Sequence, residues 1–289
     1  LENCSDIALT VEKDYFLQNG TVEKEVKTLL PTEYKIGGTL YYRFDYKEVA
    51  AKEIGDTLTA TLTFKKGGES FGGEIDVYSL KEYAAERLAV STDDSFKSLL
   101  VELLNYGAAA QIYFNYRTDS LVNDVLTDEQ RALSKDTYEE IKKITSDDDG
   151  NSYEAKITRE NVKFGNRIEL LVATSLNKSS NLDGVKLKVV YLSVDGRQKE
   201  TFVDGSEFVY RTDVNGYTAY FGALKASELR SVFELTLLRG DEKISATVKY
   251  SLDAYASNRF ENSTNENFKK LLKQTLIYSD SAKKHFEKT

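Results

Sequence analysis

The sequence predicts an α+β fold made of two tandem modules, each an antiparallel β-sheet or sandwich layer followed by a two-helix hairpin. Three observations lead to this prediction: an internal repeat with a helical pattern, alternating strand patterns upstream of each copy, and the length of the chain. At 289 residues the chain exceeds the size at which one hydrophobic core usually stays undivided. Two domains of roughly 140 residues each are therefore expected.

An internal repeat defines the helical part of each module. Residues 78–114 (YSLKEYAAERLAVSTDDSFKSLLVELLNYGAAAQIYF) align without a gap with residues 250–286 (YSLDAYASNRFENSTNENFKKLLKQTLIYSDSAKKHF), so that Tyr78 matches Tyr250 and the offset stays constant. Repetition at a fixed spacing is the signature of a duplicated structural unit. The two segments are therefore expected to fold alike.

The first helix of each copy is indicated by apolar residues at helical spacing. These residues are Leu80, Tyr83, Ala84 and Leu88 in copy one, and Leu252, Tyr255, Ala256 and Phe260 in copy two. Ser79 and Glu82 have the form of a capping box, which satisfies free amides of the first helical turn. A helix is thus predicted to begin directly after Ser79.

A second helix is predicted after residues 91–94 (STDD) in copy one and 263–266 (STNE) in copy two. Both segments are rich in side chains that accept hydrogen bonds from helix N-terminal amides. Small residues at Gly107 and Ala110, matched by Ser279 and Ala282, would let this helix lie close to a neighbouring element. The apolar face reads Phe96, Leu99, Leu100, Leu103, Gly107, Ala110 and Phe114 in copy one.

Upstream of the helices the pattern alternates, as in half-buried strands. Residues 57–64 and 232–238 are both predicted strands. The match of EVAAKEIGDTLTATL with LKASELRSVFELTLL extends the repeat at a slightly larger offset, at which Glu53 matches Glu228. The change of offset falls in the following hairpin, where KKGGESFGGE is longer than RGDEK. Further strands are predicted at 39–46, 167–175, 185–194 and 217–221.

The boundary between the modules is placed between two segments of different character. Residues 127–144 (TDEQRALSKDTYEEIKKI) are predicted to form a linker helix, and residues 146–152 (SDDDGNS) a loop. The first module then spans 1–144 and the second, a divergent copy, 152–289. Each carries its own strands and helical hairpin, so the two are expected to fold separately.

The helical motif resembles a known family of repeats. The run YSLKEYA, followed by LLVELLNYGAAAQIYFNYRTDSL (99–121), resembles a repeat common in large exported proteins of gut Clostridia and related Firmicutes. The resemblance is strong over 47–122 and weaker over 223–286, where NYGAAAQ becomes IYSDSAK. It implies this module architecture and an extracellular or cell-surface localisation. The family pattern contains no catalytic motif to transfer to these residues.

The charge and hydropathy of the chain argue against nucleic-acid binding and against a transmembrane segment. The net charge is −8 with acidic and basic residues mixed, so no concentrated cationic field is available for nucleic acid. No apolar run approaches the roughly 18 to 20 residues that span a bilayer, so no transmembrane segment is expected. The opening LENCSDIALT lacks the regions of a signal peptide, and any export signal is expected to lie outside this sequence.

The residue types that usually perform catalysis are scarce. Cys4 is the one cysteine, which rules out an internal disulfide and a thiolate cluster for metal, and it is expected in a frayed terminus. His285 is the one histidine, and the helix dipole alone favours a histidine near a helix C-terminus. Neither residue has the neighbours of an activated nucleophile. No catalytic residue, metal site or cofactor is predicted.

Two further segments have an ordinary structural interpretation. The glycine pairs in residues 65–74 lack the Lys-Ser/Thr of a nucleotide-binding loop and are expected to form a flexible hairpin. The acidic run at 147–151 could attract calcium, but its glycine and closing residue do not match the helix-loop-helix calcium loop. A solvated linker is the favoured interpretation of that run.

The tyrosine-rich strand is the best candidate for ligand contact. Tyr41, Arg43 and Asp45 share one face of this strand, and the opposite face carries Tyr42, Phe44 and Tyr46. One face must be core. The polar face is therefore either a ligand-binding surface or ordinary exposed strand.

Two functions from different classes fit these features. The leading hypothesis is a non-catalytic module pair of a bacterial surface protein, which acts as a binding, adhesion or spacer unit toward an unidentified protein or glycan. The alternative is a divergent polysaccharide-active enzyme that uses a carboxylate pair between module and linker. A deep cleft with two facing carboxylates and a raised pKa would favour the enzyme. The lack of tryptophan weakens that alternative, because sugar-processing sites commonly use aromatic platforms.

Overall fold

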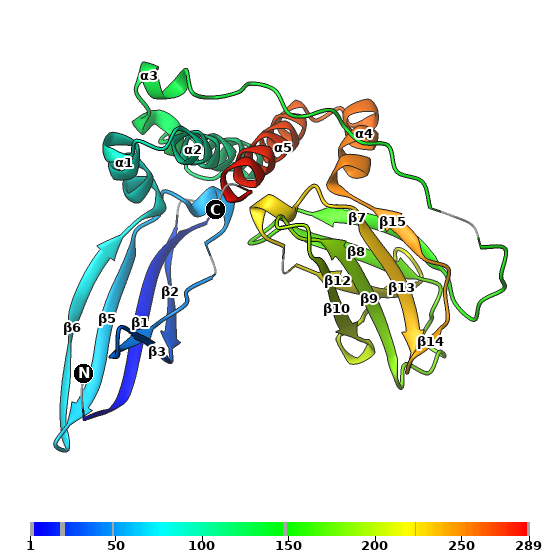
Figure 1. The fold of residues 1–289 in the computed structure, drawn as a ribbon, viewed down its shortest axis with the longest axis horizontal. Coiled ribbons are helices and arrows are strands. Elements are labelled where there is room, and N and C mark those ends of the chain that lie inside the picture. Colours follow the sequence, from blue (N-terminus) through cyan, green and yellow to red (C-terminus); the bar gives the residue numbers. More distant parts are fainter. Residues whose placement is uncertain (1–2, 18–20, 48, 147–148, 223, 288–289) are drawn as a thin grey trace. The chain divides into compact units, whose positions relative to one another are not determined.

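The computed structural model describes residues 3–17, 21–47, 49–146, 149–222 and 224–287 (Figure 1). The fold combines α-helices with antiparallel β-sheets, and the chain divides into two compact units, residues 1–133 and 134–289. This division falls after Leu133, before the boundary expected between 144 and 152. Separate folding of the two units stays a prediction.

The first unit contains one main sheet and one separate hairpin. Among its described residues the sheet has the order β2-β1-β5-β6, and β3 pairs with β4. The alternating pattern at 57–64 correctly predicted β5. The expectation of a frayed N-terminus was wrong, because Cys4 begins β1 and lies opposite Lys66 of β5. The strands are β1 (Cys4–Phe16), β2 (Val22–Leu29), β3 (Thr32–Ile36), β4 (Thr39–Arg43), β5 (Leu58–Lys66) and β6 (Glu69–Tyr78).

The predicted hairpin at 65–74 is present as the connection between β5 and β6. Gly67 and Gly68 form its turn with φ of +61° and +89°, a backbone region that glycine enters without a steric penalty. The second glycine pair, Gly72 and Gly73, lies within β6. The segment is therefore a paired hairpin with a tight turn.

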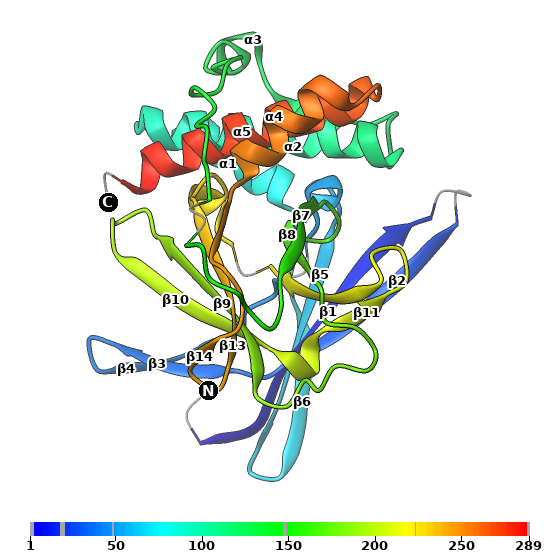
Figure 2. The ribbon, with the colours of Figure 1, turned by 90° about the vertical axis from the view of Figure 1, so that its right-hand side faces the viewer.

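The helices of the first unit begin at the positions that the capping residues in the sequence predicted. The helix α1 (Leu80–Val90) follows Ser79, whose hydroxyl accepts the N–H of Glu82 at 3.1 Å. The helix α2 (Asp94–Phe114) follows Asp93, which caps the first turn in the same way. Two 3₁₀ turns pack against α2, namely η1 (Ala51–Glu53) and η2 (Val122–Val125). Both views place these helices at one end of the strands (Figures 1 and 2).

The hydrophobic core of the first unit is formed by these helices and turns. As far as the described residues go, none of the buried members of this cluster lies in a strand. This cluster thus stabilises the helical end of the unit, whereas Ile7 and Val11 are buried separately in β1. The buried members are Ile54, Ala84, Leu88, Leu100, Val101, Leu104, Ala108, Val122 and Leu126.

The second unit contains two sheets that share one core. One sheet has the order β11-β12-β8-β7, and the other has β10-β9-β13-β14, with β15 also on β13. Val172 and Phe221 of the first sheet belong to the same buried cluster as Leu187 and Leu235 of the second, so the arrangement is sandwich-like. The strands are β7 (Ile157–Lys163), β8 (Glu169–Thr174), β9 (Val185–Leu192), β10 (Gln198–Asp204), β11 (Val209–Arg211), β12 (Gly216–Phe221), β13 (Phe233–Arg239), β14 (Glu242–Lys243) and β15 (Val248–Tyr250).

The helices of the second unit repeat those of the first. The helices α4 (Leu252–Asn262) and α5 (Glu266–Phe286) begin and end at the positions that match the ends of α1 and α2 in the repeat. The turn η4 (Ala226–Glu228), which packs against α5, begins at the residue that matches Ala51, the first residue of η1. A further turn, η3 (Gly205–Glu207), connects β10 to β11. The aligned sequences therefore form elements of the same kind and length.

The predicted linker helix was wrong over most of its length. In place of a helix over 127–144, α3 (Asp128–Arg131) is one short turn of helix, and the described residues from 134 to 146 contain no regular element. Asp136 has a positive φ of 51°, which is incompatible with a continuing right-handed helix. The reason that the segment stays extended lies in the side chains that bind its backbone.

Candidate functional site

The predicted ligand-binding residues lie together on the β3–β4 hairpin. Tyr41 and Arg43 belong to β4, Asp45 follows it, and all three are exposed. Tyr41 faces Tyr34 across the hairpin with ring centroids 5.6 Å apart, and Arg43 Nη2 lies 2.9 Å from Asp45 Oδ2. The sequence analysis did not include Tyr34 among the site residues. Its position could have been inferred, because it lies in the segment directly before the Gly37-Gly38 turn and therefore faces Tyr41 across the hairpin.

The opposite face of this segment is half-buried, as one of the two faces had to be. Tyr42, Phe44 and Tyr46 are all of intermediate exposure, whereas Arg43 and Asp45 between them are exposed. Strand pairing nevertheless stops at Arg43, before the predicted end of the strand at Tyr46. The alternation of side chains therefore continues beyond the ladder of backbone hydrogen bonds.

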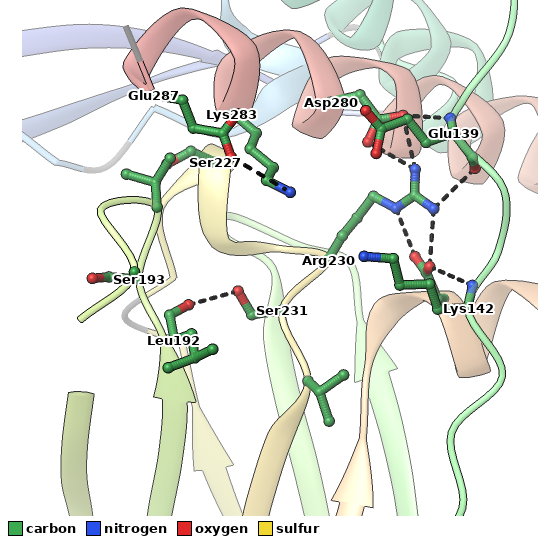
Figure 3. A pocket seen from close by; sticks show the side chains of 14 residues that line it. Glu139, Lys142, Leu192, Ser193, Ser227, Arg230, Ser231, Asp280, Lys283 and Glu287 are labelled. Atoms are coloured by element: carbon green, nitrogen blue, oxygen red, sulfur yellow. Dashed lines mark hydrogen bonds and ion pairs between the residues drawn. The ribbon is translucent and has the colours of Figure 1, made fainter. Parts of the chain in front are cut away.

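A second candidate site is a pocket of about 360 Å³ in the second unit (Figure 3). Its walls come from the extended segment after residue 134, the β9–β10 loop, the chain between η4 and β13, and the helices α4 and α5. Beside Leu192, Val194 and Val232, the lining includes charged and hydroxyl side chains: Glu139, Lys142, Ser193, Ser227, Arg230, Ser231, Asp253, Asp280, Lys283 and Glu287.

Arg230 is the central side chain of this pocket. Its side chain, which is 10% exposed, lies against two carboxylates, with Nε 2.7 Å from Asp253 Oδ1 and Nη1 2.7 Å from Asp280 Oδ1. Asp253 lies in the first turn of α4 and Asp280 in the C-terminal half of α5, so one guanidinium links both helices to the chain before β13. A planar guanidinium with five N–H donors suits such a site, because it can bind two carboxylates at once.

The same cluster binds the backbone of the extended segment. The N–H of Glu139 donates to Asp280 at 2.7 Å, and the N–H of Lys142 donates to Asp253 at 3.0 Å. The carbonyl oxygens of Glu139 and Glu140 accept from Arg230 Nη2 at 3.0 and 3.1 Å. In a helix over 127–144 these backbone groups would instead have formed hydrogen bonds with groups four residues away in the same helix. Side chains of the second unit therefore hold this segment extended.

The electrostatics of the cluster favour a structural role. Burial raises the pKa of Asp280, and the N–H of Glu139 and the Arg230 guanidinium oppose that rise. Burial lowers the pKa of Arg230, but Asp253 and Asp280 together outweigh it and raise the pKa. Every oxygen of the two carboxylates accepts at least one hydrogen bond. A carboxylate that is saturated in this way is a poor general base.

An alignment of the two copies could have identified this cluster from the sequence. In the alignment of the repeat, Arg230 corresponds to Gly55, Asp253 to Lys81 and Asp280 to Ala108. Three charges that can pair with one another are therefore specific to copy two. A cluster of this kind leaves no local motif, because its members come from distant segments.

The remaining polar groups of the pocket include lysine, serine and glutamate side chains. Lys142 and Lys283 point their amino groups toward the open space, and Lys283 Nζ lies 3.6 Å from Glu287 (Figure 3). The Ser231 hydroxyl donates to the carbonyl oxygen of Leu192 at 3.0 Å. The rim of the pocket thus carries both cationic and anionic side chains.

Each unit also has an ion pair at its 3₁₀ turn, formed by a buried glutamate. Glu53 of η1 binds Lys13 of β1 at 2.7 Å, and Glu228 of η4 binds Lys199 of β10 at 2.6 Å. The two glutamates are almost fully buried and occupy the same position of the repeat. Each pair connects a turn that packs on a helix with a strand of the main sheet.

The remaining candidates from the sequence are dispersed. Of the acidic run at 147–151, Asp147 and Asp148 lie outside the described residues. Asp149 accepts from Tyr153 at 2.5 Å and from Lys243 at 3.0 Å, and these contacts lower its pKa to about 2. His285 lies directly before Phe286, the last residue of α5. Within the described ranges no group of three or more Cys, His, Asp or Glu residues could hold a metal ion.

Comparisons of this chain with protein-family models, with curated proteins and with solved structures gave no match. Across the part of the chain that the structure describes, no helix has both the length and the apolar character needed to cross a membrane.

Proposed function

We propose that the chain is a pair of tandem modules of an exported, cell-surface protein, and that it acts in binding or adhesion without catalysis. Each module consists of a main antiparallel sheet, a strand hairpin, a 3₁₀ turn and a two-helix hairpin. The observation that carries the proposal is the correspondence of α1, α2 and η1 with α4, α5 and η4 at the positions matched by the sequence repeat. Duplicated modules are typical of surface proteins that present binding faces or act as spacers.

The contact face of the first module is the exposed side of the β3–β4 hairpin. Tyr34 and Tyr41 expose 42% and 43% of their surfaces as a tilted pair, beside the ion pair of Arg43 with Asp45. Aromatic rings offer apolar area at a low entropic cost, and the neighbouring charged groups can fix the orientation of a partner. This combination suits a glycan or a protein surface.

The arrangement of the carboxylates argues against the enzyme alternative. The two carboxylates that face each other in the pocket of the second unit, Asp253 and Asp280, share Arg230. A glycosidase needs one carboxylic acid to donate a proton and a second carboxylate that is free to act as base or nucleophile. The shared guanidinium and the backbone N–H groups of Glu139 and Lys142 occupy the oxygens of both carboxylates, so neither carboxylate is free for these roles.

A binding assay on an array of polysaccharides and glycoproteins tests the proposal, together with a measurement of reducing ends released from the same polysaccharides. We expect at least one glycan or glycoprotein to bind and no reducing ends to be released above the buffer background. Tyr41→Ala should weaken that binding by about tenfold or more, because it removes one ring of a central aromatic pair. Its thermal unfolding should be unchanged.

Tyr210→Ala is the matched control, because Tyr210 pairs with Tyr217 across the corresponding β11–β12 hairpin of the second unit. This variant should bind like the wild type. Release of reducing ends that is lost in Asp253→Asn would contradict the non-catalytic role. Equal binding by Tyr41→Ala and the wild type would contradict the assignment of the contact face.

A further inference from the structure

The sheet β11-β12-β8-β7 of the second unit has an outer face that does not take part in the core. Val162, Val172 and Ala219, from three of its strands, belong to the buried core cluster. Because side chains alternate along a strand, the residues next to them point to the opposite face. The members of this outer face that bear on binding are Arg159 and Lys163 of β7, Ala173 of β8, Arg211 of β11, and Thr218 and Tyr220 of β12.

The middle of the outer face consists of small side chains. Thr218 lies opposite Ala173 on the neighbouring strand, and Ala173 lies opposite Arg159 on the next one. Thr218 is 1% exposed, and within the described part of the chain its hydroxyl has no hydrogen-bond partner. Burial of a hydroxyl without a partner costs free energy, and a hydrogen bond from a ligand would remove that cost.

Two arginines from the outer strands share one carboxylate beside these small residues. Arg211 Nη2 lies 2.6 Å from Asp213 Oδ2. The hydrogen bond with Arg211 lowers the pKa of Asp213, and the charge of Arg159 adds to this effect. Arg159 itself is exposed, and among the described residues no carboxylate lies within ion-pair distance of its guanidinium. A planar guanidinium in this state can bind a carboxylate of a ligand through two parallel hydrogen bonds.

Tyr220 is the aromatic residue of the outer face and has cations on two sides. Lys163 Nζ lies 5.5 Å from the centroid of its ring, and the Tyr220 hydroxyl, after Asp213, helps to raise the pKa of Arg211. Lys163 also shares one carboxylate with Arg167, because both lie 3.1 Å from Glu169. Cations therefore outnumber carboxylates on this face, although the chain as a whole carries a net charge of −8.

We propose that this outer face binds a carboxylate-bearing polysaccharide, that is, a chain of uronic acid units. A sugar ring packs on Tyr220, and the carboxylates bind Arg159 and the cations beside the ring. Sugar hydroxyls can both donate to and accept from the hydroxyl of Thr218. A peptide on the face of a sheet would find no partners for its backbone amides, because the face presents side chains only. The inference rests on the binding role of the proposed function and adds a ligand class for the second module.

Calorimetric titration of the full chain with polygalacturonate tests this inference. The methyl-esterified polymer is the matched ligand, because it keeps the sugar and loses the charge. We expect polygalacturonate to bind about tenfold or more tightly than the ester, and its binding to weaken as the salt concentration rises. Polyglutamate, which is acidic but has no sugar ring, should bind about tenfold more weakly than polygalacturonate.

Three variants of the second unit show where the polymer binds. Arg159→Gln should weaken binding by about tenfold, because it removes a two-point contact with a carboxylate. Tyr220→Leu keeps an apolar side chain but loses the planar ring, and should weaken binding by about fivefold. Arg197→Gln is the matched control, since it removes an 83% exposed cation from the turn between β9 and β10 of the other sheet, and it should bind like the wild type. Circular dichroism shows whether all three variants are folded.

Several outcomes would overturn the inference. Among them are no binding of polygalacturonate, equal affinity for its ester or for polyglutamate, and unchanged binding by the folded Arg159→Gln. Binding that is lost in Tyr41→Ala and kept in Arg159→Gln would place the acidic glycan on the first module, which overturns this inference and leaves the proposed function intact. The proposed function itself fails only if no glycan or glycoprotein of the array binds, or if catalysis is found.

Discussion

Gly107 shows how one residue fixes the contact between a helix and a turn. A Cβ atom added at Gly107 in α2 would lie 2.8 Å from Val122 Cγ1 and 3.2 Å from the carbonyl oxygen of Ala51. Glycine costs about 1 kcal/mol relative to alanine in a helix, so its presence there needs a reason. The close approach of η1 and η2 supplies that reason.

In the second copy a different small residue makes the corresponding contact between the long helix and the 3₁₀ turn. Ser279, which corresponds to Gly107, donates its hydroxyl proton to the carbonyl oxygen of Ala226 at 2.8 Å. Ala226 of η4 corresponds to Ala51 of η1. In both units a small residue of the long helix therefore packs against the 3₁₀ turn, and the second unit has space for a hydroxyl group there.

Gly107→Leu should destabilise the first unit by on the order of 1 to 3 kcal/mol, because the new side chain overpacks the contact with Val122 and Ala51. Urea unfolding gives the magnitude, and hydrogen exchange assigns the loss to α2 while α5 stays unchanged. Gly73→Leu is the control, because a Cβ at Gly73 meets nothing within 4 Å. Wild-type stability of Gly107→Leu would defeat the packing account and would favour an exposed contact face for a partner.

At the scale of an element, the segment from 134 to 146 illustrates a local preference that tertiary contacts override. Its sequence is rich in helix-forming residues, and 127–144 was expected to be helical. Asp253, Asp280 and Arg230 instead bind the N–H and carbonyl groups of residues 139–142. Tyr138 also stacks on Phe260 of α4 with ring centroids 5.9 Å apart. These contacts compensate for the missing helical hydrogen bonds.

Asp280→Asn should release this segment. The change leaves Arg230 buried with one carboxylate and weakens the contact with the N–H of Glu139, which should cost on the order of 3 kcal/mol. Hydrogen exchange of the amides at 139–142 should become faster than in the wild type.

Asp241→Asn is the matched control for this change. Asp241 is fully exposed and lies 3.4 Å from Lys186, and surface pairs of this kind contribute little to the free energy of unfolding because water screens them. Its exchange pattern should match that of the wild type. Unchanged protection of residues 139–142 in Asp280→Asn would mean that Asp253, Arg230 and the packing of Tyr138 hold the segment without Asp280.

At the scale of the whole molecule, the position of the division determines which fragments can fold. The second compact unit begins at Ser134, so the segment bound by Arg230 belongs to it and not to the first module. Tyr138 and Ile141 also pack against the core of the second unit. A boundary at 144–152 would separate this segment from the side chains that hold it.

Separate expression of two fragments tests this division. Residues 134–289 should unfold cooperatively, whereas residues 152–289 should be less stable by several kcal/mol, since they lose two core contacts and leave Arg230 with fewer partners. Urea unfolding followed by circular dichroism measures the difference. Equal stability of the two fragments would show that the segment from 134 to 146 is not needed for folding and that a boundary between 144 and 152 is adequate.

The helices could be predicted from the sequence because their signals are local. Ser79, Asp93, Ser251 and Asn265 cap the four long helices, and each helix begins at the next residue. Apolar spacing and cap chemistry depend on neighbours within a few residues, and the repeat supplied each pattern twice. The strands with clear alternation, such as β5, β9 and β13, could be predicted for the same reason.

Other features were decided by contacts between distant segments. The strand β1 begins at Cys4 because β5, a distant part of the chain, pairs with it, and no local pattern marks that partner. The Arg230 cluster joins three segments that are far apart in sequence, and β4 ends at Arg43 because no described strand lies along its other edge. The sequence by itself determined which residues form helices and alternating faces, because those depend on local chemistry. The tertiary structure decided which backbone groups have partners, because that depends on what the rest of the chain brings beside them.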